Sequence, residues 1–235
     1  MRVIKHIVQF SGGKDSTCML LMMLERDMPI DDIIFCDTTM EFPGMYDHIA
    51  KVERYIGRKV TRLRPPHDFI YYFAQYRKTR GKNRGEYGYG WPRMWSRWCT
   101  RLFKIDLTAK YLRNIGDYRL YIGIAYDEPK RHDKRRSNVI HPLYDWGITE
   151  SMALQYCYDH GFDWGGLYEK FRRVSCWCCP LQSLNELRNL RKYYPELWQK
   201  LIEMDDMREY KFSPRFSVKD LELRFAIEDR QLSLF

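Results

Sequence analysis

Residues 6–24 read HIVQFSGGKDSTCMLLMML, with two glycines, a lysine and an acid between an apolar run and a segment of helical periodicity. The common phosphate loop separates its two glycines by four residues and follows them with Lys and Ser or Thr. Here Gly12 and Gly13 are adjacent, and Lys14 is followed by Asp15. Adjacent glycines let the backbone N–H groups approach an anion, and the following helix adds its positive end. The stretch therefore predicts a strand, a phosphate-binding turn and a helix.

The side chains of this glycine turn (residues 11–17) add to the predicted anion site. Ser11, Ser16 and Thr17 offer hydroxyl donors, and Lys14 offers a positive charge. Asp15 is the odd member, because a carboxylate beside a phosphate needs a proton or a metal ion. A bound Mg²⁺ would meet that need.

Strands and helices alternate through the first part of the chain. Apolar runs predict strands at 3–10, 31–38, 58–63 and 118–126, and periodicity predicts helices at 15–26, 43–56 and 99–114. This alternation predicts a parallel sheet with helices on both faces, whose ligands bind at the carboxyl ends of the strands. Both the glycine turn and Asp37 lie at such ends.

The later part of the chain is predicted to be mostly helical, with Thr149 as the N-cap of the first helix. Periodicity predicts helices at 150–159, 181–192 and 195–210. We therefore expect a nucleotide-binding α/β domain over residues 1–147 and a helical region over 148–235.

Composition excludes some classes of protein. Of the 235 residues 45% are hydrophobic, but no apolar run is long enough to span a membrane. The N-terminal residues lack the features of a signal peptide, so we expect a cytoplasmic protein. The seven cysteines are then expected to be reduced thiols.

The net charge of +9 is concentrated in residues 76–113, where eleven Lys and Arg residues stand against two acids. Five aromatic residues are interleaved with them: Tyr87, Tyr89, Trp91, Trp95 and Trp98. Such a segment can neutralise phosphates and stack on unpaired bases; the alternative is a solvated loop whose aromatics pack on the protein. The candidate nucleic-acid-binding residues are Arg77, Lys78, Arg80, Lys82, Arg84, Arg93 and Arg97.

A second cluster of chemistry-bearing residues is the cysteine loop (residues 176–179), which lies within the stretch SCWCCPLQSL. The Cys-x-x-Cys spacing of Cys176 and Cys179 lets two thiolates face one centre, with Cys178 between them. The following proline fits iron–sulfur ligation. Zinc, and two structural thiols without a metal, remain alternatives.

The SGGKDS turn after a first strand resembles the pyrophosphate loop of the ATP-pyrophosphatase (PP-loop) superfamily, in its phosphoadenosine-phosphosulfate-reductase-like branch. Further segments resemble that branch in the same order: FCDTTMEFPGMYDHIAKVERYIG, WCTRLFKIDLTAKYL, GIAYDEPKR and HPLYDWGITESMALQYCYDHG. The resemblance covers roughly residues 5–200.

The resemblance implies a five-stranded parallel sheet flanked by helices, the adenine nucleotide alpha hydrolase-like fold, with ATP or a related nucleotide as ligand. It assigns the glycine turn to the pyrophosphate, with Lys14 and Asp15 as the catalytic residues. The implied nucleotide-binding residues are Ser11, Gly12, Gly13, Ser16, Thr17, Asp37, Thr38, Glu128 and Arg131.

The resemblance also bears on the cysteines. Related iron–sulfur reductases carry a Cys-Cys pair where this chain has Trp98 and Cys99. Cys99, Cys176 and Cys179 would then be three ligands of a 4Fe–4S cluster, with Cys178 as a candidate fourth. The family's sulfonucleotide reductases use a thiol on a C-terminal tail, and this chain has no cysteine after Cys179.

Together these features predict an enzyme that uses Mg²⁺ and ATP to adenylate an acceptor, which sulfur then attacks. The acceptor is expected to be tRNA or the DNA backbone, with a sulfur donor such as a cysteine desulfurase and a homodimeric assembly. Two alternatives stay open: a sulfonucleotide reductase that uses an external thiol, and a non-catalytic nucleotide-binding subunit.

Overall fold

The computed structural model describes residues 4–132, 136–207 and 211–232. A five-stranded sheet lies at the centre of the α/β part, and all of its strand pairs are parallel. The strands are β1 (Lys5–Gln9), β2 (Asp32–Cys36), β3 (Thr61–Leu63), β4 (Tyr118–Ile122) and β5 (Val139–Ile140), in the order β3-β2-β1-β4-β5.

Strand β1 is where the winding of the sheet changes direction, because β2 pairs with one side of it and β4 with the other. Gln9, the last residue of β1, pairs with Ile34 and Ile122. The segments that leave the carboxyl ends of these three strands therefore meet at one edge. Such a switch point is the usual ligand site of an open α/β sheet.

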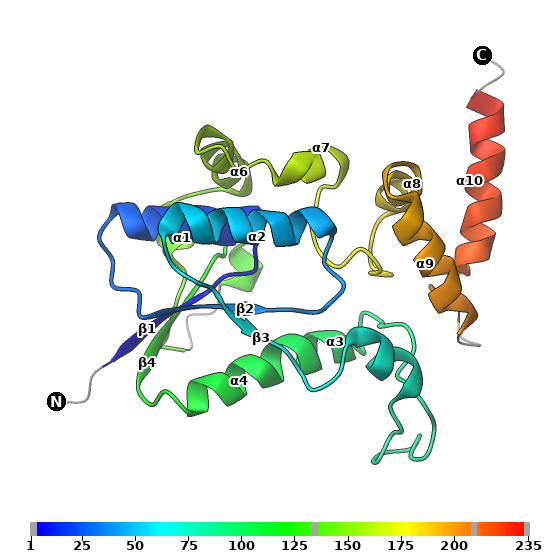
Figure 1. Cartoon of the computed structure of the whole chain (residues 1–235), viewed down its shortest axis with the longest axis horizontal. Helices are drawn as coiled ribbons and strands as arrows, with labels where there is room; N and C mark the ends of the chain where they lie inside the picture. Colours follow the sequence, from blue (N-terminus) through cyan, green and yellow to red (C-terminus); the bar gives the residue numbers. More distant parts are fainter. Residues whose placement is uncertain (1–3, 133–135, 208–210, 233–235) are drawn as a thin grey trace.

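Helices cover both faces of the sheet (Figure 1), as an all-parallel sheet requires. Helices α1 (Lys14–Glu25) and α2 (Pro43–Ile56) lie on one face, with α6 (Glu150–Asp159) beyond them, and α4 (Asp106–Arg113) lies on the other. The alternation within β2 explains both layers. Ile33 and Phe35 pack toward the larger core, whereas Ile34 packs with Leu112 of α4.

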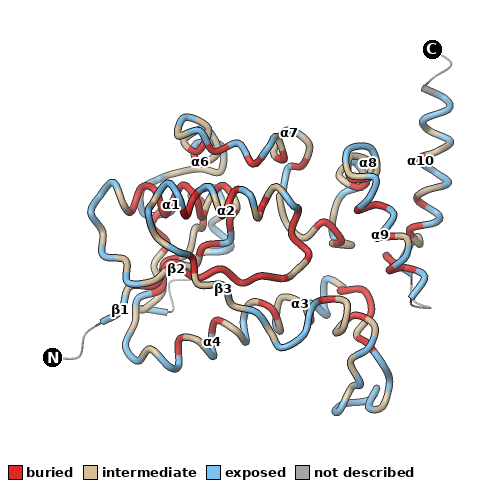
Figure 2. Tube along the Cα trace, viewed as in Figure 1, coloured by how far each residue is buried: buried red, intermediate tan, exposed pale blue. Residues whose placement is uncertain are grey.

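The remaining helices are short or C-terminal. The short elements are α3 (Trp98–Thr100), α5 (Pro142–Asp145), α7 (Leu167–Lys170), the π-helical turns Tyr71–Gln75 and Arg101–Ile105, and the 3₁₀ turns Pro129–Arg131 and Trp164–Gly166. The C-terminal group comprises α8 (Leu184–Tyr193), α9 (Pro195–Asp206) and α10 (Val218–Leu232), which lie beyond one end of the sheet (Figure 1). Figure 2 shows buried residues concentrated on β1, β2 and α1, and exposed residues along most of α10.

The predicted fold class is confirmed, and α2 has the predicted bounds. Strand β5, helix α10 and several short elements, among them α5 and α7, were not predicted. Strand β5 has only two residues, too few for a periodicity, and α10 mixes apolar and charged residues in equal number. Helix α9 ends at Asp206, and residues 208–210 of the predicted helix lie outside the described residues.

No helix within the described ranges is long and apolar enough to cross a membrane.

Candidate functional site

The glycine turn connects β1 to α1 and is closed by its own side chains. Gly12 has a φ of +77°, and a Cβ built there would lie 2.5 Å from Sδ of Met45, so only glycine fits. The Ser16 hydroxyl accepts a hydrogen bond from N–H of Ser11 (3.1 Å) and donates to the carbonyl of Gly13 (3.0 Å). The predicted turn is thus a folded loop whose shape is fixed by short-range bonds.

Two aromatic side chains from a distant segment hold the same turn from outside. Nε1 of Trp164 donates to the carbonyl oxygen of Gly12 at 2.7 Å. The hydroxyl of Tyr168 accepts a hydrogen bond from N–H of Lys14, the first residue of α1, at 2.8 Å. These two residues lie about 150 positions after the turn in the sequence, and no sequence motif pointed to them.

His48 of α2 supports the turn through contacts with Thr17 and Trp164. Its Nε2 lies 2.9 Å from Oγ1 of Thr17, and its ring stacks on Trp164 with centroids 4.3 Å apart. Burial lowers the pKa of His48 to about 3, so the ring is neutral at physiological pH. His48 therefore acts as a polar packing residue beneath the loop, which suits its deeply buried position.

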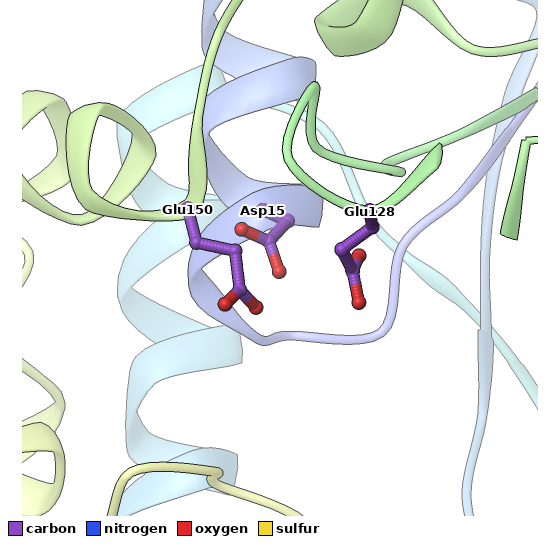
Figure 3. A group of neighbouring side chains, drawn as sticks. All are labelled: Asp15, Glu128 and Glu150. Atoms are coloured by element: carbon purple, nitrogen blue, oxygen red, sulfur yellow. The ribbon is translucent and has the colours of Figure 1, made fainter. Parts of the chain in front are cut away.

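Lys14 points toward carboxylates on the open side of the turn. Its Nζ lies 2.9 Å from Glu150 and 3.2 Å from Asp15. Oxygens of Asp15, Glu128 and Glu150 lie within 4.8 Å of one another (Figure 3). Burial raises the pKa of Asp15, although the Lys14 ammonium opposes that shift. Sequence reasoning included Asp15 and Glu128 but missed Glu150, which it treated only as the residue after a helix cap.

The carboxylate trio (Asp15, Glu128 and Glu150) has the chemistry of a magnesium site, because Mg²⁺ prefers oxygen ligands and commonly uses one or two carboxylates plus phosphate oxygens. Glu128 lies on the loop after β4 and also pairs with Arg131 at 2.6 Å. The chain runs close to α1 at Gly123, because a Cβ built there would lie 3.0 Å from the backbone of Asp15 and Ser16. The donor set therefore fits Mg²⁺ beside the turn.

Asp37 and Thr38 follow β2 and face different partners. The buried carboxylate of Asp37 accepts hydrogen bonds from Nε of Arg64 (2.8 Å), the hydroxyl of Tyr46 (2.8 Å) and N–H of Thr39 (2.8 Å). This carboxylate thus holds the strand end in place. The Thr38 hydroxyl instead lies 3.2 Å from Sγ of Cys176.

The cysteine loop packs against the segment after β2. N–H of Trp177 donates to the carbonyl of Met40 at 3.0 Å. The Thr38 hydroxyl donates to Glu41 at 2.8 Å, and Sγ of Cys176 lies 3.6 Å from the same Glu41 carboxylate. The segment that contains the predicted nucleotide-binding residues Asp37 and Thr38 therefore reaches the first cysteine of the loop.

Burial raises the pKa of all four candidate ligand thiols, Cys99, Cys176, Cys178 and Cys179. Charge on Cys99 would raise the pKa of Cys178 and Cys179 further, so the three thiols are neighbours. Sequence reasoning grouped these residues by spacing and resemblance, and the fold brings α3 and the cysteine loop together.

Two basic residues face this thiol group. Burial alone would lower the pKa of Lys104, but the nearby Cys176 and Glu41 raise it above its ordinary value. Arg97 favours the ionised form of Cys179. Neither Lys104 nor Glu41 was singled out from the sequence, because their proximity to cysteines depends on tertiary structure.

The spacing of the thiols bears on which metal they fit. One zinc ion holds sulfurs at about 2.3 Å, so ligating sulfurs lie within roughly 4.6 Å of each other. Within the described ranges, the carboxylate trio is the only group of three candidate ligands that lie within 4.8 Å of one another. The cysteines do not form a ready zinc tetrahedron.

The basic segment forms an irregular hairpin in which Arg77 pairs with Tyr87. Two predicted nucleic-acid-binding residues have structural partners: Lys78 pairs with Glu86 at 3.0 Å, and Arg93 donates to the carbonyls of Lys211 and Phe212. The other five are exposed, namely Arg77, Arg80, Lys82, Arg84 and Arg97.

The aromatics of this segment fall into two groups. Trp91 and Trp98 are buried, and Tyr89 stacks on Trp98 with centroids 5.3 Å apart. Trp95 is 82% exposed, and Tyr87 is also exposed. Packing on the protein therefore accounts for three aromatics, and two remain available to a partner.

Comparison with known proteins addresses the family directly. A profile described as the phosphoadenosine phosphosulfate reductase domain matches residues 5–182, which contain the glycine turn, the carboxylate trio and the cysteine loop. The chain belongs to this family.

Individual relatives agree with this placement. The chain is 29% identical over 222 residues to an uncharacterised protein of Methanocaldococcus jannaschii, covering 87% of this chain and 42% of that protein. It is 25% identical to the adenosine 5'-phosphosulfate reductase of Geobacillus kaustophilus, and the match covers 74% of this chain and 73% of that protein. The chain spans about half the length of the first curated relatives it matches.

Among solved structures, the fold is similar to that of phosphoadenylyl-sulfate reductase from Candida auris in a phosphate complex. The TM-score is 0.51 at 18% identity, and the match covers 73% of this chain and 81% of that chain. This likeness confirms the fold.

Proposed function

We propose that this family member binds ATP with Mg²⁺ and breaks the bond between its α and β phosphates, transferring AMP to an oxygen of a nucleic acid. The observation that carries the proposal is the carboxylate trio beside the glycine turn. Three carboxylates next to a polyphosphate repel it unless a divalent cation lies between them. That arrangement favours Mg²⁺-bound ATP as the substrate.

The turn supplies most of the proposed catalysis. An acceptor oxygen attacks the α-phosphorus, the bond from that phosphorus to the bridging oxygen breaks, and pyrophosphate leaves with the electron pair. Backbone N–H groups of the turn and the ammonium of Lys14 stabilise the charge that gathers on pyrophosphate. Asp15, Glu128 and Glu150 would hold Mg²⁺, which neutralises phosphate charge when bound.

The second half of the proposed reaction uses the cysteines. A sulfide equivalent from a donor such as a cysteine desulfurase attacks the adenylated atom, a bond to sulfur forms, and AMP leaves with the former acceptor oxygen. Cys99, Cys176 and Cys179, with Cys178 as a candidate fourth, would hold an iron–sulfur cluster that presents sulfur near the nucleotide. The contact between Thr38 and Cys176 supports this, because it joins the cysteine loop to the strand end that would lie beside the nucleotide.

The exposed part of the basic segment supports a nucleic-acid acceptor. Arg77, Arg80, Lys82 and Arg84 are exposed in one hairpin, and the exposed Arg97 is close enough to Cys179 to favour its ionised form. Exposed cations of this kind bind phosphates of tRNA or DNA, and Trp95 offers a stacking surface for an unpaired base.

A sulfonucleotide reductase is the second candidate, and the likeness to the Geobacillus kaustophilus reductase favours it. In that reaction a thiol attacks the sulfur of the nucleotide and the adenosine phosphate leaves. A second thiol then releases sulfite, and in this candidate the thiols come from another molecule.

One experiment separates these candidates. Anaerobically purified protein is incubated with ATP, with and without tRNA or DNA, and separately with adenosine phosphosulfate, phosphoadenosine phosphosulfate and a thiol. Pyrophosphate release that nucleic acid stimulates supports the proposal, whereas sulfite release without pyrophosphate release supports the reductase. Nucleotide binding without either product contradicts both and leaves a nucleotide-binding subunit.

A further inference from the structure

The hydroxyl of Tyr168 lies at the amide end of α1, where the proposed function places the pyrophosphate. It accepts the hydrogen bond of N–H of Lys14 at 2.8 Å. A Cβ built on Gly13 would lie 3.3 Å from the same hydroxyl, so the phenol approaches the turn closely over its second glycine. Tyr168 thus occupies the rim of the turn itself.

Unusual backbone geometry aims this tyrosine at the turn. Trp164 has a φ of +52°, and Gly165 and Gly166 follow at +61° and +75°. A left-handed conformation is routine for glycine but is an outlier for a bulky residue such as tryptophan. Strain of this kind persists where the surrounding structure enforces it, commonly at ligand sites.

The strained segment directs two side chains to one loop. The indole of Trp164 is hydrogen-bonded to the Gly12 carbonyl, and the ring of Tyr168 packs edge-on against that indole with centroids 4.8 Å apart. The position of the Tyr168 hydroxyl is therefore fixed by the same residue that holds the glycine turn.

The hydrogen-bonding capacity of the hydroxyl is only half used. A phenol has one proton to donate, and among the described residues Tyr168 has no acceptor for it within hydrogen-bond distance. Because N–H of Lys14 already occupies the acceptor side, the O–H bond must point elsewhere. Burial raises the pKa of Tyr168, which keeps the proton in place.

We propose that Tyr168 is a phosphate-binding residue. Its hydroxyl accepts the hydrogen bond from N–H of Lys14 and donates its own hydrogen bond to an oxygen of the pyrophosphate group. This inference rests on the proposed function in one respect, namely that the glycine turn holds pyrophosphate. It adds a neutral donor to the positive groups of the site and explains why a distant segment is held against the turn.

The test is calorimetric titration of the whole chain with inorganic pyrophosphate and Mg²⁺. Tyr168→Phe keeps the ring against Trp164 and removes only the hydroxyl, so affinity should fall about tenfold, as for loss of one hydrogen bond to a charged group. Tyr55→Phe is the matched control, because Tyr55 is exposed on α2, and its affinity should be unchanged. Unfolding temperatures of the three proteins verify that each is folded.

The possible outcomes distinguish a failure of the role of Tyr168 from a failure of the proposed function. Unchanged affinity in Tyr168→Phe overturns the role of the hydroxyl, and tighter binding overturns it by showing that the hydroxyl competes for the Lys14 amide. If the unaltered protein binds no pyrophosphate, the proposed function fails and the role of Tyr168 fails with it.

Gly13→Ala provides a second route to the same answer. The backbone of Gly13, at φ −77° and ψ 168°, is open to alanine, but the new methyl group would crowd the Tyr168 hydroxyl. The loss of pyrophosphate affinity should therefore be smaller when Gly13→Ala is made in Tyr168→Phe than in the unaltered protein. Equal losses in the two backgrounds would show that the hydroxyl does not act at the turn.

Discussion

The glycine turn and the cysteine loop lie at the same edge of the sheet, yet they are organised by different means. The turn has its shape fixed by a glycine φ, by the Ser16 hydroxyl and by the indole of Trp164. The cysteine loop is anchored through its backbone at Trp177, while its thiols are protonated because burial raises their pKa.

This difference indicates that the two sites depend on different events. The turn offers its N–H groups with no chemical change, so its function should depend on geometry and on the carboxylate trio. Thiols must lose protons to bind a metal, so the proposed iron–sulfur cluster would complete the cysteine loop only once its thiols are ionised. Damage to one site should therefore spare the other.

The largest expected effect is on catalysis at the turn. Asp15→Asn keeps the shape of the side chain but removes a charge that would hold Mg²⁺, so pyrophosphate release should fall on the order of 100-fold or more. Iron content after anaerobic reconstitution should not change. Asp47→Asn, an exposed acid on α2, is the control. Parallel loss of iron would show that the two sites are not independent.

The converse change acts at the cysteine loop. Cys176→Ser removes a proposed ligand, so bound iron should fall roughly tenfold or more, by comparison with losses seen on changing metal-site residues. Pyrophosphate release should stay close to that of the unaltered protein. Cys18→Ala changes a core thiol on α1 and should retain iron. Full iron content in Cys176→Ser would remove this residue from the ligand set.

A third change tests how the basic hairpin is attached. Buried Asp205 of α9 accepts hydrogen bonds from Nε1 of Trp91 (2.7 Å) and N–H of Val218 (2.6 Å). Asp205→Ala leaves two buried donors without partners, so the free energy of unfolding should fall by about 2–4 kcal/mol. Urea unfolding measures this, with Asp206→Ala as an exposed control. A loss below about 1 kcal/mol would contradict a structural role for this contact.

His48 gives the turn region a pH dependence. Its pKa is about 3 in the folded protein against 6.5 in the unfolded chain, so the unfolded state takes up a proton first as pH falls. The contribution of neutral His48 to the free energy of unfolding is fully present above pH 6.5. It should decline by about 1.4 kcal/mol per pH unit toward pH 3. The difference in unfolding free energy between the unaltered protein and His48→Gln should shrink at this rate between pH 6 and 4. A difference independent of pH would show that His48 titrates normally.

The smallest expected effect concerns the nucleic acid. Each exposed cation that contacts a phosphate contributes about 0.7–0.9 to the slope of log affinity against log salt. Changing Arg84 to alanine should lower the slope for tRNA or DNA by up to that amount, whereas Arg54→Ala on α2 should leave it unchanged. Equal slopes in all three proteins would place the nucleic acid elsewhere.

Much of the architecture could be predicted because it depends on patterns that are local in the sequence. Alternating apolar runs and helical periodicities located four strands and the helices that flank them, and the adjacent glycines marked the turn at the first strand end. Their meeting at one edge follows from the geometry of parallel sheets. Strand β5 lacked such a signal because two residues carry no period.

The supporting residues could not be predicted for the opposite reason. Trp164 and Tyr168 reach the turn from about 150 residues away, and His48 looks like any polar residue on an amphipathic helix. Glu150 follows a helix cap and gave no sign that it would meet Lys14. Nothing in the sequence around Asp37 showed that its carboxylate would accept hydrogen bonds from Arg64 and Tyr46.

The most direct test of the central claim follows the two ends of ATP during one reaction. The protein is incubated with Mg²⁺ and nucleic acid, without a sulfur donor, and with ATP labelled either at the α or at the γ phosphate. The account predicts that the γ label appears in pyrophosphate and the α label becomes attached to the nucleic acid. Release of the γ label as orthophosphate with the α label in ADP would contradict it, as would ATP left intact while a sulfonucleotide is reduced.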